Sequence, residues 1–129
     1  MTLLNISHFD SMDKARRHYL TRIDSLAEEA RGELPGKAAA HEAKYQEAMR
    51  YPDGEFPFLA REAKELRLPV ERLVSTVLLA RRRWEKRDAE IESVRVSSRR
   101  KIREAVSTQH MEEIAQRTMV TLDVMGASA

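Results

Sequence analysis

His41 and Glu42 come closer than any other residues of this chain to a known catalytic pattern. They begin the helical sequence H-E-x-x-H, in which two imidazoles one turn apart hold zinc and the glutamate acts as a base. Tyr45 stands where the second imidazole is needed. The other three histidines are scattered along the chain. We therefore expect no metal site.

Neighbouring carboxylates are the second group of side chains with chemical potential. The pairs are Glu28 with Glu29, Glu62 with Glu65, and Glu112 with Glu113. General acid–base catalysis needs carboxylates that face each other in a cleft, with displaced pKa values. In a chain with 34% charged residues, adjacent acids on a solvated helix follow from composition alone. With four glycines and no glycine-rich phosphate loop, the sequence predicts no enzyme, no cofactor and no small-molecule substrate.

Basic side chains form the third group, and they are unevenly placed. The net charge is +2, but residues 69–106 hold 11 basic and 6 acidic side chains. Arg95, Arg99 and Arg103 follow one another at a spacing of four, so they share one helical face that could contact phosphate. Acidic residues are interspersed at helical pairing distance, which favours a solvated, salt-bridged flank over a nucleic-acid site. Binding of nucleic acid stays as the less favoured alternative, and a steep loss of DNA binding with added salt would support it.

The elements that must position these side chains are helices. The 129 residues are 42% apolar, with four prolines, and a chain so poor in Gly and aromatics favours an all-α fold. Caps and breakers predict five helices, over residues 11–31, 37–51, 57–67, 69–106 and 108–124. They form one helical domain over 11–125, preceded by a short arm over 1–10 and followed by a flexible tail over 126–129. Asp10 or Ser11 caps the first helix, and Ser107 or Thr108 the last.

The helix over 69–106 carries a heptad-like apolar seam. Val70, Val77, Trp84 and Ile91 are seven residues apart, the spacing of a coiled-coil contact. At ~1.5 Å per residue the helix is on the order of 55 Å long, whereas a compact domain of this size has a radius of gyration near ~14 Å. The sequence thus predicts a helical bundle or hairpin built around this helix. The seam is expected to pack against the first helix or against a second copy.

The chain has no cysteine, so disulfides and thiolate metal sites are excluded. This usage fits a cytosolic folding environment. We find no apolar segment of the length that a signal peptide or a membrane span needs, so no membrane association is expected.

Several helical segments together resemble a module of uncharacterised tail-region proteins of tailed bacteriophages and prophages. The resemblance lies in packing positions and turn breakers over residues 16–31, 35–36, 45–48, 56–63, 73–79, 84, 91–95, 101–102 and 114. In that group the module follows a longer N-terminal region, which is a short arm here. The resemblance implies a phage structural or assembly protein, with other phage proteins or itself as partner. Such a protein acts in the host cytoplasm during assembly and then in the virion. The alternative is a small phage-encoded regulator that binds nucleic acid or a host protein through the Arg95, Arg99 and Arg103 face.

Overall fold

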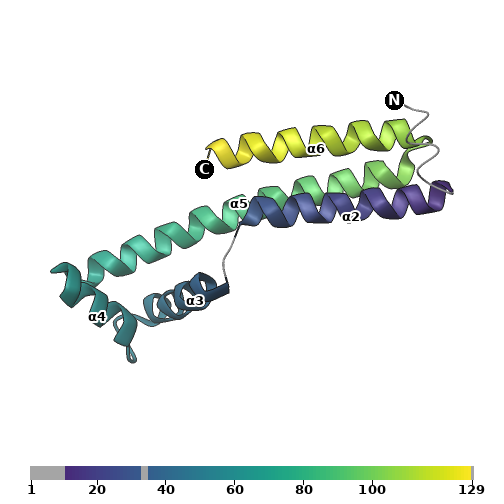
Figure 1. Cartoon of the computed structure of the whole chain (residues 1–129). Coiled ribbons are helices and arrows are strands. Elements are labelled where there is room, and N and C mark those ends of the chain that lie inside the picture. Colours follow the sequence, from purple (N-terminus) through teal and green to yellow (C-terminus); the bar gives the residue numbers. More distant parts are fainter. Residues whose placement is uncertain (1–10, 33–34, 129) are drawn as a thin grey trace. The chain divides into compact units, whose positions relative to one another are not determined.

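Five helices follow one another along the computed structural model, which describes residues 11–32 and 35–128 (Figure 1). They are α2 (Met12–Arg31), α3 (Pro35–Arg50), α4 (Pro57–Leu66), α5 (Val70–Glu104) and α6 (Thr108–Ser128). No strand occurs within the described residues. The prediction of an all-α fold with one long helix is confirmed. The predicted arm over 1–10 and the last residue of the predicted tail lie outside the described residues.

Short polar side chains begin two of these helices, as the sequence predicts. The Ser11 hydroxyl accepts a hydrogen bond from the Lys14 N–H at 3.2 Å, and the Ser107 hydroxyl accepts one from the His110 N–H at 3.1 Å. Each bond satisfies a backbone donor that the first helical turn leaves without a carbonyl partner. Gly32 ends α2 with a φ of 59°, a left-handed conformation that glycine adopts at little cost.

Helix ends differ from the sequence-based expectation by a few residues. α3 begins at Pro35 and not at 37, because proline suits a first helical turn, where its missing N–H is not needed. α4 ends at Leu66, and Arg67 caps it with a φ of 56°, which the sequence did not indicate. α5 ends at Glu104, where the Ala105 N–H bonds to the Ile102 carbonyl and tightens the last turn. α6 continues to Ser128, since a single glycine at 126 weakens a helix without ending it.

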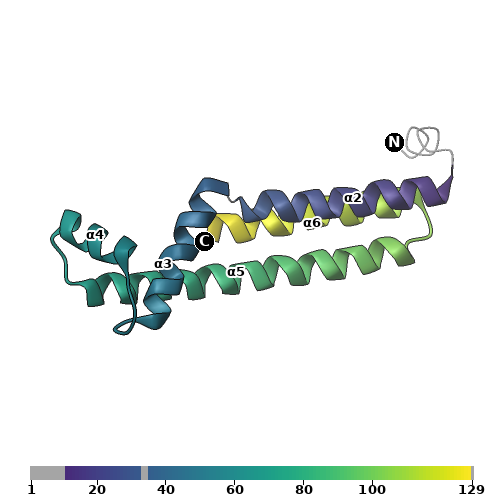
Figure 2. The same cartoon turned by 90° about the horizontal axis from the view of Figure 1, so that it is seen from below.

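The helices form two compact units that share α5. The first unit contains α2, the part of α5 from Arg87 onward, and α6, which lie side by side (Figures 1 and 2). Its interior is apolar and falls into two clusters. One cluster contains Ala15, Tyr19, Ile23, Ile102, Ala105, Met111, Ile114 and Ala115. The other contains Ala27, Ile91 and Leu122, with half-buried Leu26, Ala30, Val94 and Met125 against it.

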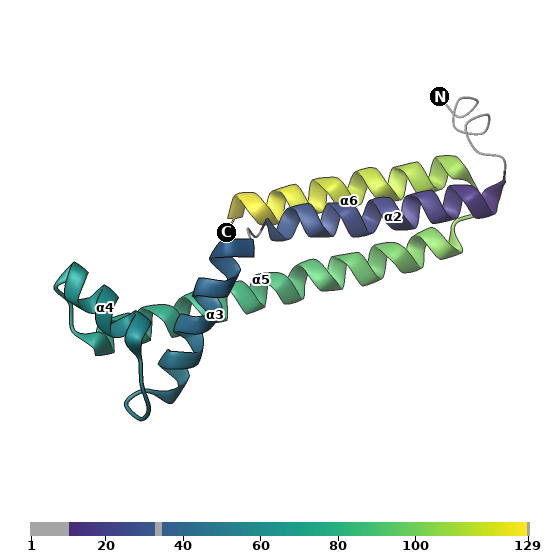
Figure 3. The ribbon, with the colours of Figure 1, turned by 60° about the horizontal axis from the view of Figure 1, so that its bottom comes forward.

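The second unit contains α3, α4 and the part of α5 before residue 87 (Figure 3). Its core consists of Ala48, Leu59, Ala63 and Leu73, with Phe56, Leu68, Val70, Val74, Val77 and Leu78 packed against it. A buried glutamate, Glu47, lies beside this core and accepts hydrogen bonds from the backbone of α4. The single domain predicted over 11–125 stays a prediction.

Candidate interaction surface on α5

The four predicted seam residues lie in the two units as follows. Val70 and Val77 pack, half-buried, on the core of the second unit. Ile91 is 1% exposed and packs against Ala27 of α2 and Leu122 of α6 in the first unit. These three side chains therefore contribute to packing within the chain. Packing of Ile91 on α2 is one of the two contacts that the seam predicts.

Trp84, the fourth seam residue, takes part in a polar cluster in the second unit. The Arg81 guanidinium lies 4.1 Å from the ring centroid of Tyr45 and 5.2 Å from that of Trp84. It also forms ion pairs of 2.6 Å with Glu42 and 2.9 Å with Glu85. The bond with Glu42 is the main cause of the raised pKa of Arg81, and it lowers the pKa of Glu42. Glu42 and Tyr45, which occupy the zinc-motif positions, thus hold an arginine by charge and by cation–π attraction.

Six charged side chains join α2 to α5 in the first unit, and we call them the arginine–carboxylate ladder. Signs alternate along it in the order Asp88, Arg31, Glu92, Arg95, Asp24, Arg99. Successive members are joined by N–O distances of 2.7, 2.9, 2.7, 3.0 and 2.8 Å. The arginine side chains are only 22–28% exposed, so their stems also cover apolar surface. Two further arginines donate to backbone carbonyls in the first unit: Arg87 to Ala30 of α2, and Arg16 to Ala105, the residue after the end of α5.

The ladder determines what remains of the predicted phosphate-binding face. Arg95 and Arg99 both bond to Asp24, and Arg95 also bonds to Glu92 through two nitrogens. Their guanidinium groups are directed at carboxylates of the same chain. Arg103 is exposed, as are the neighbouring Arg100 and Lys101. The face predicted from the spacing of four therefore divides into two arginines of the ladder and one exposed arginine.

The ladder makes stability depend on pH in the acid range. Hydrogen bonds from Arg95 and Arg31 lower the pKa of Glu92 to about 2 from an ordinary value of 4.5. A carboxylate with a depressed pKa in the folded state contributes stability above its unfolded pKa and loses it as pH falls toward the folded value. We expect the urea midpoint to fall between about pH 4.5 and pH 2, and this fall to be smaller in Glu92→Gln. Glu113→Gln, at an exposed site on α6, is the matched control and should keep the wild-type profile. Equal profiles for wild type and Glu92→Gln would contradict this role.

Two buried polar contacts were not predicted from the sequence. Glu47 accepts hydrogen bonds from the N–H groups of Phe58 at 3.1 Å and Leu59 at 2.9 Å. The Thr118 hydroxyl lies 2.7 Å from the Ser98 hydroxyl and joins α6 to α5. Ser98 follows Ile91 by seven residues and so continues the spacing of the seam, and a hydroxyl buried at such a position needs a partner. Nothing comparable marked Glu47 among the many glutamates of the chain.

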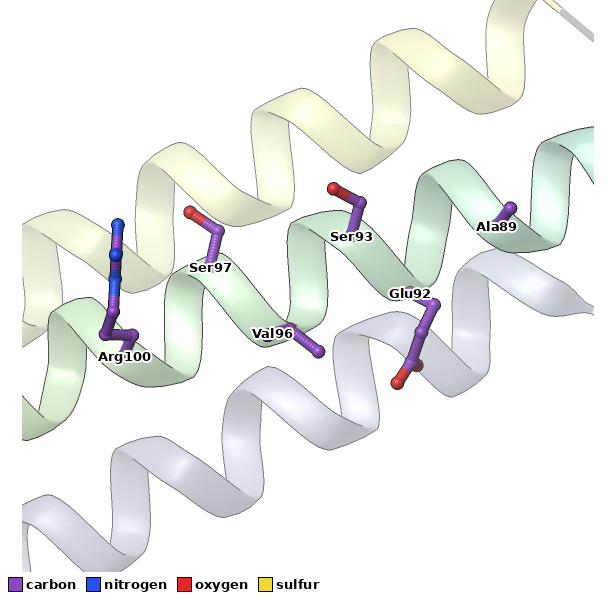
Figure 4. Close-up of a pocket in the computed structure, with 6 residues that line it drawn as sticks. All are labelled: Ala89, Glu92, Ser93, Val96, Ser97 and Arg100. Carbon is purple, nitrogen blue, oxygen red and sulfur yellow. The ribbon is translucent and has the colours of Figure 1, made fainter.

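The side of α5 turned away from the first unit's core carries small and exposed side chains. A shallow, open hollow there is lined by Ala89, Glu92, Ser93, Val96, Ser97 and Arg100. Figure 4 shows Ala89, Ser93 and Ser97 on successive turns, with Arg100 one turn beyond Ser97 and Val96. Val96 is 54% exposed. We call Ala89, Glu90, Ser93, Val96, Ser97, Arg100 and Lys101 the outer face of α5.

Residues 11–32 and 35–128 contain no group of three or more His, Cys, Asp or Glu side chains that could hold a metal ion. Within the same residues, no helix combines the length and apolar character needed to cross a bilayer. Comparisons with protein-family models, with characterised proteins and with solved structures give no significant match.

Proposed function

We propose that this chain is a non-enzymatic bacteriophage protein of the virion or of tail assembly, acting through helix-mediated contacts with other proteins. Its partners are other phage structural proteins, a second copy of the chain, or both. Small-molecule substrates, cofactors and membranes have no part in this proposal. The protein acts in the cytoplasm of the bacterial host during assembly and then belongs to the particle.

One observation carries this proposal: the two sides of α5 are used differently. Arg95 and Arg99 hold α2 through the ladder. The outer face combines small side chains and the exposed Val96 with the exposed charges of Glu90, Arg100 and Lys101. Small and apolar groups on an exposed helix face suit close contact with another protein surface. The resemblance of the helical segments to phage tail-region proteins supplies the biological setting.

A phage-encoded regulator that binds nucleic acid or a host protein is the second candidate. It is favoured by the exposure of Arg103 beside Arg100 and Lys101. Three exposed cations near the end of α5 could bind phosphate or an acidic protein surface. Because Arg95 and Arg99 bond to carboxylates of the chain itself, we rank this candidate below protein assembly.

Density-gradient fractionation of phage particles tests the proposed function. We expect an epitope-tagged copy of the chain to co-sediment with complete particles or with tails that lack heads. Deletion of the gene should reduce the number of infectious particles, because assembly cannot proceed without the contacts that this chain provides. A host cytoplasmic protein with the same tag is the control and should stay at the top of the gradient. If the chain also stays at the top at every stage, and deletion leaves particle number and tail morphology unchanged, the proposal is wrong.

A further inference from the structure

We propose that a second copy of this chain packs antiparallel on the outer face of α5, about a two-fold axis midway between Ser93 and Ser97. The proposal deepens the proposed function, on which it rests for the idea that this chain works through helix-mediated contacts. It names both the surface and its occupant. Three observations carry it: the side chains of the face, their complementary order, and the charge distribution of the first unit.

The outer face lies opposite the buried side of α5. At ~100° per residue, Ala89, Ser93, Val96, Ser97 and Arg100 fall within an arc of about 100° on the helix circumference. Ile91, Ser98 and Ile102, which are buried, lie on the other side. Because Ser93 and Ser97 are small, a second helix can approach this face closely, with a distance between helix axes near the short end of the usual range of about 8–10 Å. Val96 adds exposed apolar surface beside them.

The residue order on this face complements itself when one copy is reversed. Across a two-fold axis between Ser93 and Ser97, Ser93 of one copy faces Ser97 of the second copy, and Ser97 faces Ser93. The same axis places Glu90 against Arg100, twice, and Ala89 against Lys101. In a parallel arrangement Arg100 and Lys101 would meet the same cations of the second copy, which is unfavourable. Neither Glu90 nor Arg100 forms an ion pair within the described part of the chain.

Charge is also distributed unevenly along the first unit. The end with the start of α2 and the end of α5 carries 8 basic and 4 acidic side chains, and the opposite end carries 4 and 7. The first end contains residues 12–22, 97–105 and 106–115, and the opposite end contains residues 23–32, 87–96 and 116–126. Antiparallel packing brings the basic end of one copy beside the acidic end of the other. This charge complementarity selects a second copy as the occupant and fixes its orientation.

The contact is one helix face that extends for about 20 Å, at ~1.5 Å per residue. Such a contact lies at the low end of protein–protein interface sizes, which is typical of weak and transient association. Because opposite charges meet at the rim, the association should weaken as salt is added. Dilute samples will contain monomer.

Sedimentation of the purified full chain, without any phage component, tests the proposal. The average mass should rise from 14.9 kDa toward twice that value as the protein concentration increases from about 5 to about 500 µM at low salt. A monomer over that whole range overturns the proposal. The same result is expected if the outer face instead binds a phage protein or nucleic acid. Sedimentation uses the chain alone and the particle test uses phage particles, so failure of the dimer can be told apart from failure of the proposed function.

Charge reversal tests the register. Glu90→Arg alone and Arg100→Glu alone each place two like-charged pairs across the axis, so each should weaken self-association at least about ten-fold. The double variant should associate like the wild type, and an equimolar mixture of the two single variants should form a heterodimer. Far-UV circular dichroism should be unchanged, because both side chains are exposed. Single variants that self-associate as strongly as the wild type, or a mixture that stays monomeric, overturn the proposal.

Discussion

Replacing Ile91 by alanine is expected to lower the free energy of unfolding by about 2–4 kcal/mol, the usual cost of truncating a buried isoleucine. The side chain is 1% exposed and lies where Ala27 of α2 and Leu122 of α6 meet α5. Truncation removes apolar contacts to both helices and leaves a cavity that neighbouring backbones cannot fill. Urea denaturation followed by far-UV circular dichroism measures the loss.

Val106→Ala is the matched control for Ile91→Ala. Val106 is 87% exposed and lies in the connection between α5 and α6, so its truncation should change stability by less than about 0.5 kcal/mol. The same experiment separates two roles of the predicted seam. If Ile91 mainly contacted another chain, its truncation would lower the sedimenting mass while the urea midpoint of the dilute monomer stayed unchanged. That outcome would contradict the packing described for the first unit.

Glu47→Ala should destabilise the second unit by about 1–3 kcal/mol, the cost of leaving buried donors without an acceptor. Its carboxylate accepts the N–H bonds of Phe58 and Leu59 in the first turn of α4, and Pro57 in that turn has no N–H. The side chain of the N-cap residue, Phe56, makes no capping hydrogen bond that could replace the carboxylate. The single tryptophan, Trp84, belongs to the second unit, so its fluorescence during urea denaturation reports on this loss.

Glu47→Gln separates the two parts of this effect. Glutamine keeps the size of the side chain but has one carbonyl oxygen in place of the two carboxylate oxygens. It can therefore replace only part of the hydrogen bonding, and its amide adds N–H donors of its own. We expect a loss intermediate between wild type and Glu47→Ala. Glu55→Ala, at an exposed position just before α4, should leave the transition unchanged. A Glu47→Ala variant as stable as wild type would show that the cap contributes nothing to folding.

Helix number and order followed from the sequence because breakers are local. Gly32, Pro57 and Pro69 act on the backbone of their immediate neighbours, and their effect does not depend on what packs against the helix. The cap at Arg67 could not be foreseen, since an arginine with a positive φ is rare and depends on the surrounding structure. The extension of α6 beyond 124 escaped prediction because a terminal glycine shifts a helix end by only a small energy.

The role of the basic side chains was predictable only in part. Interspersed acids favoured a salt-bridged flank, but within the ladder pairing along one helix explains only the bond between Arg95 and Glu92. The ladder partners of Arg99 and Arg31 lie 57 or more residues away along the chain, and only the pairing of α2 with α5 brings them together. Sequence spacing gave the shared face of Arg95 and Arg99. It could not give the carboxylate of Asp24 that both of them contact.

The arginine–carboxylate ladder has a consequence for behaviour on heating. Hydration of ions becomes less favourable as temperature rises, so the desolvation cost of bringing these six charges together declines. The contribution of apolar burial levels off over the same range. The pairing of α2 with α5 should therefore depend more on its charges at high temperature than at room temperature. Raised ionic strength should reduce the free energy of unfolding more near the melting temperature than in the cold.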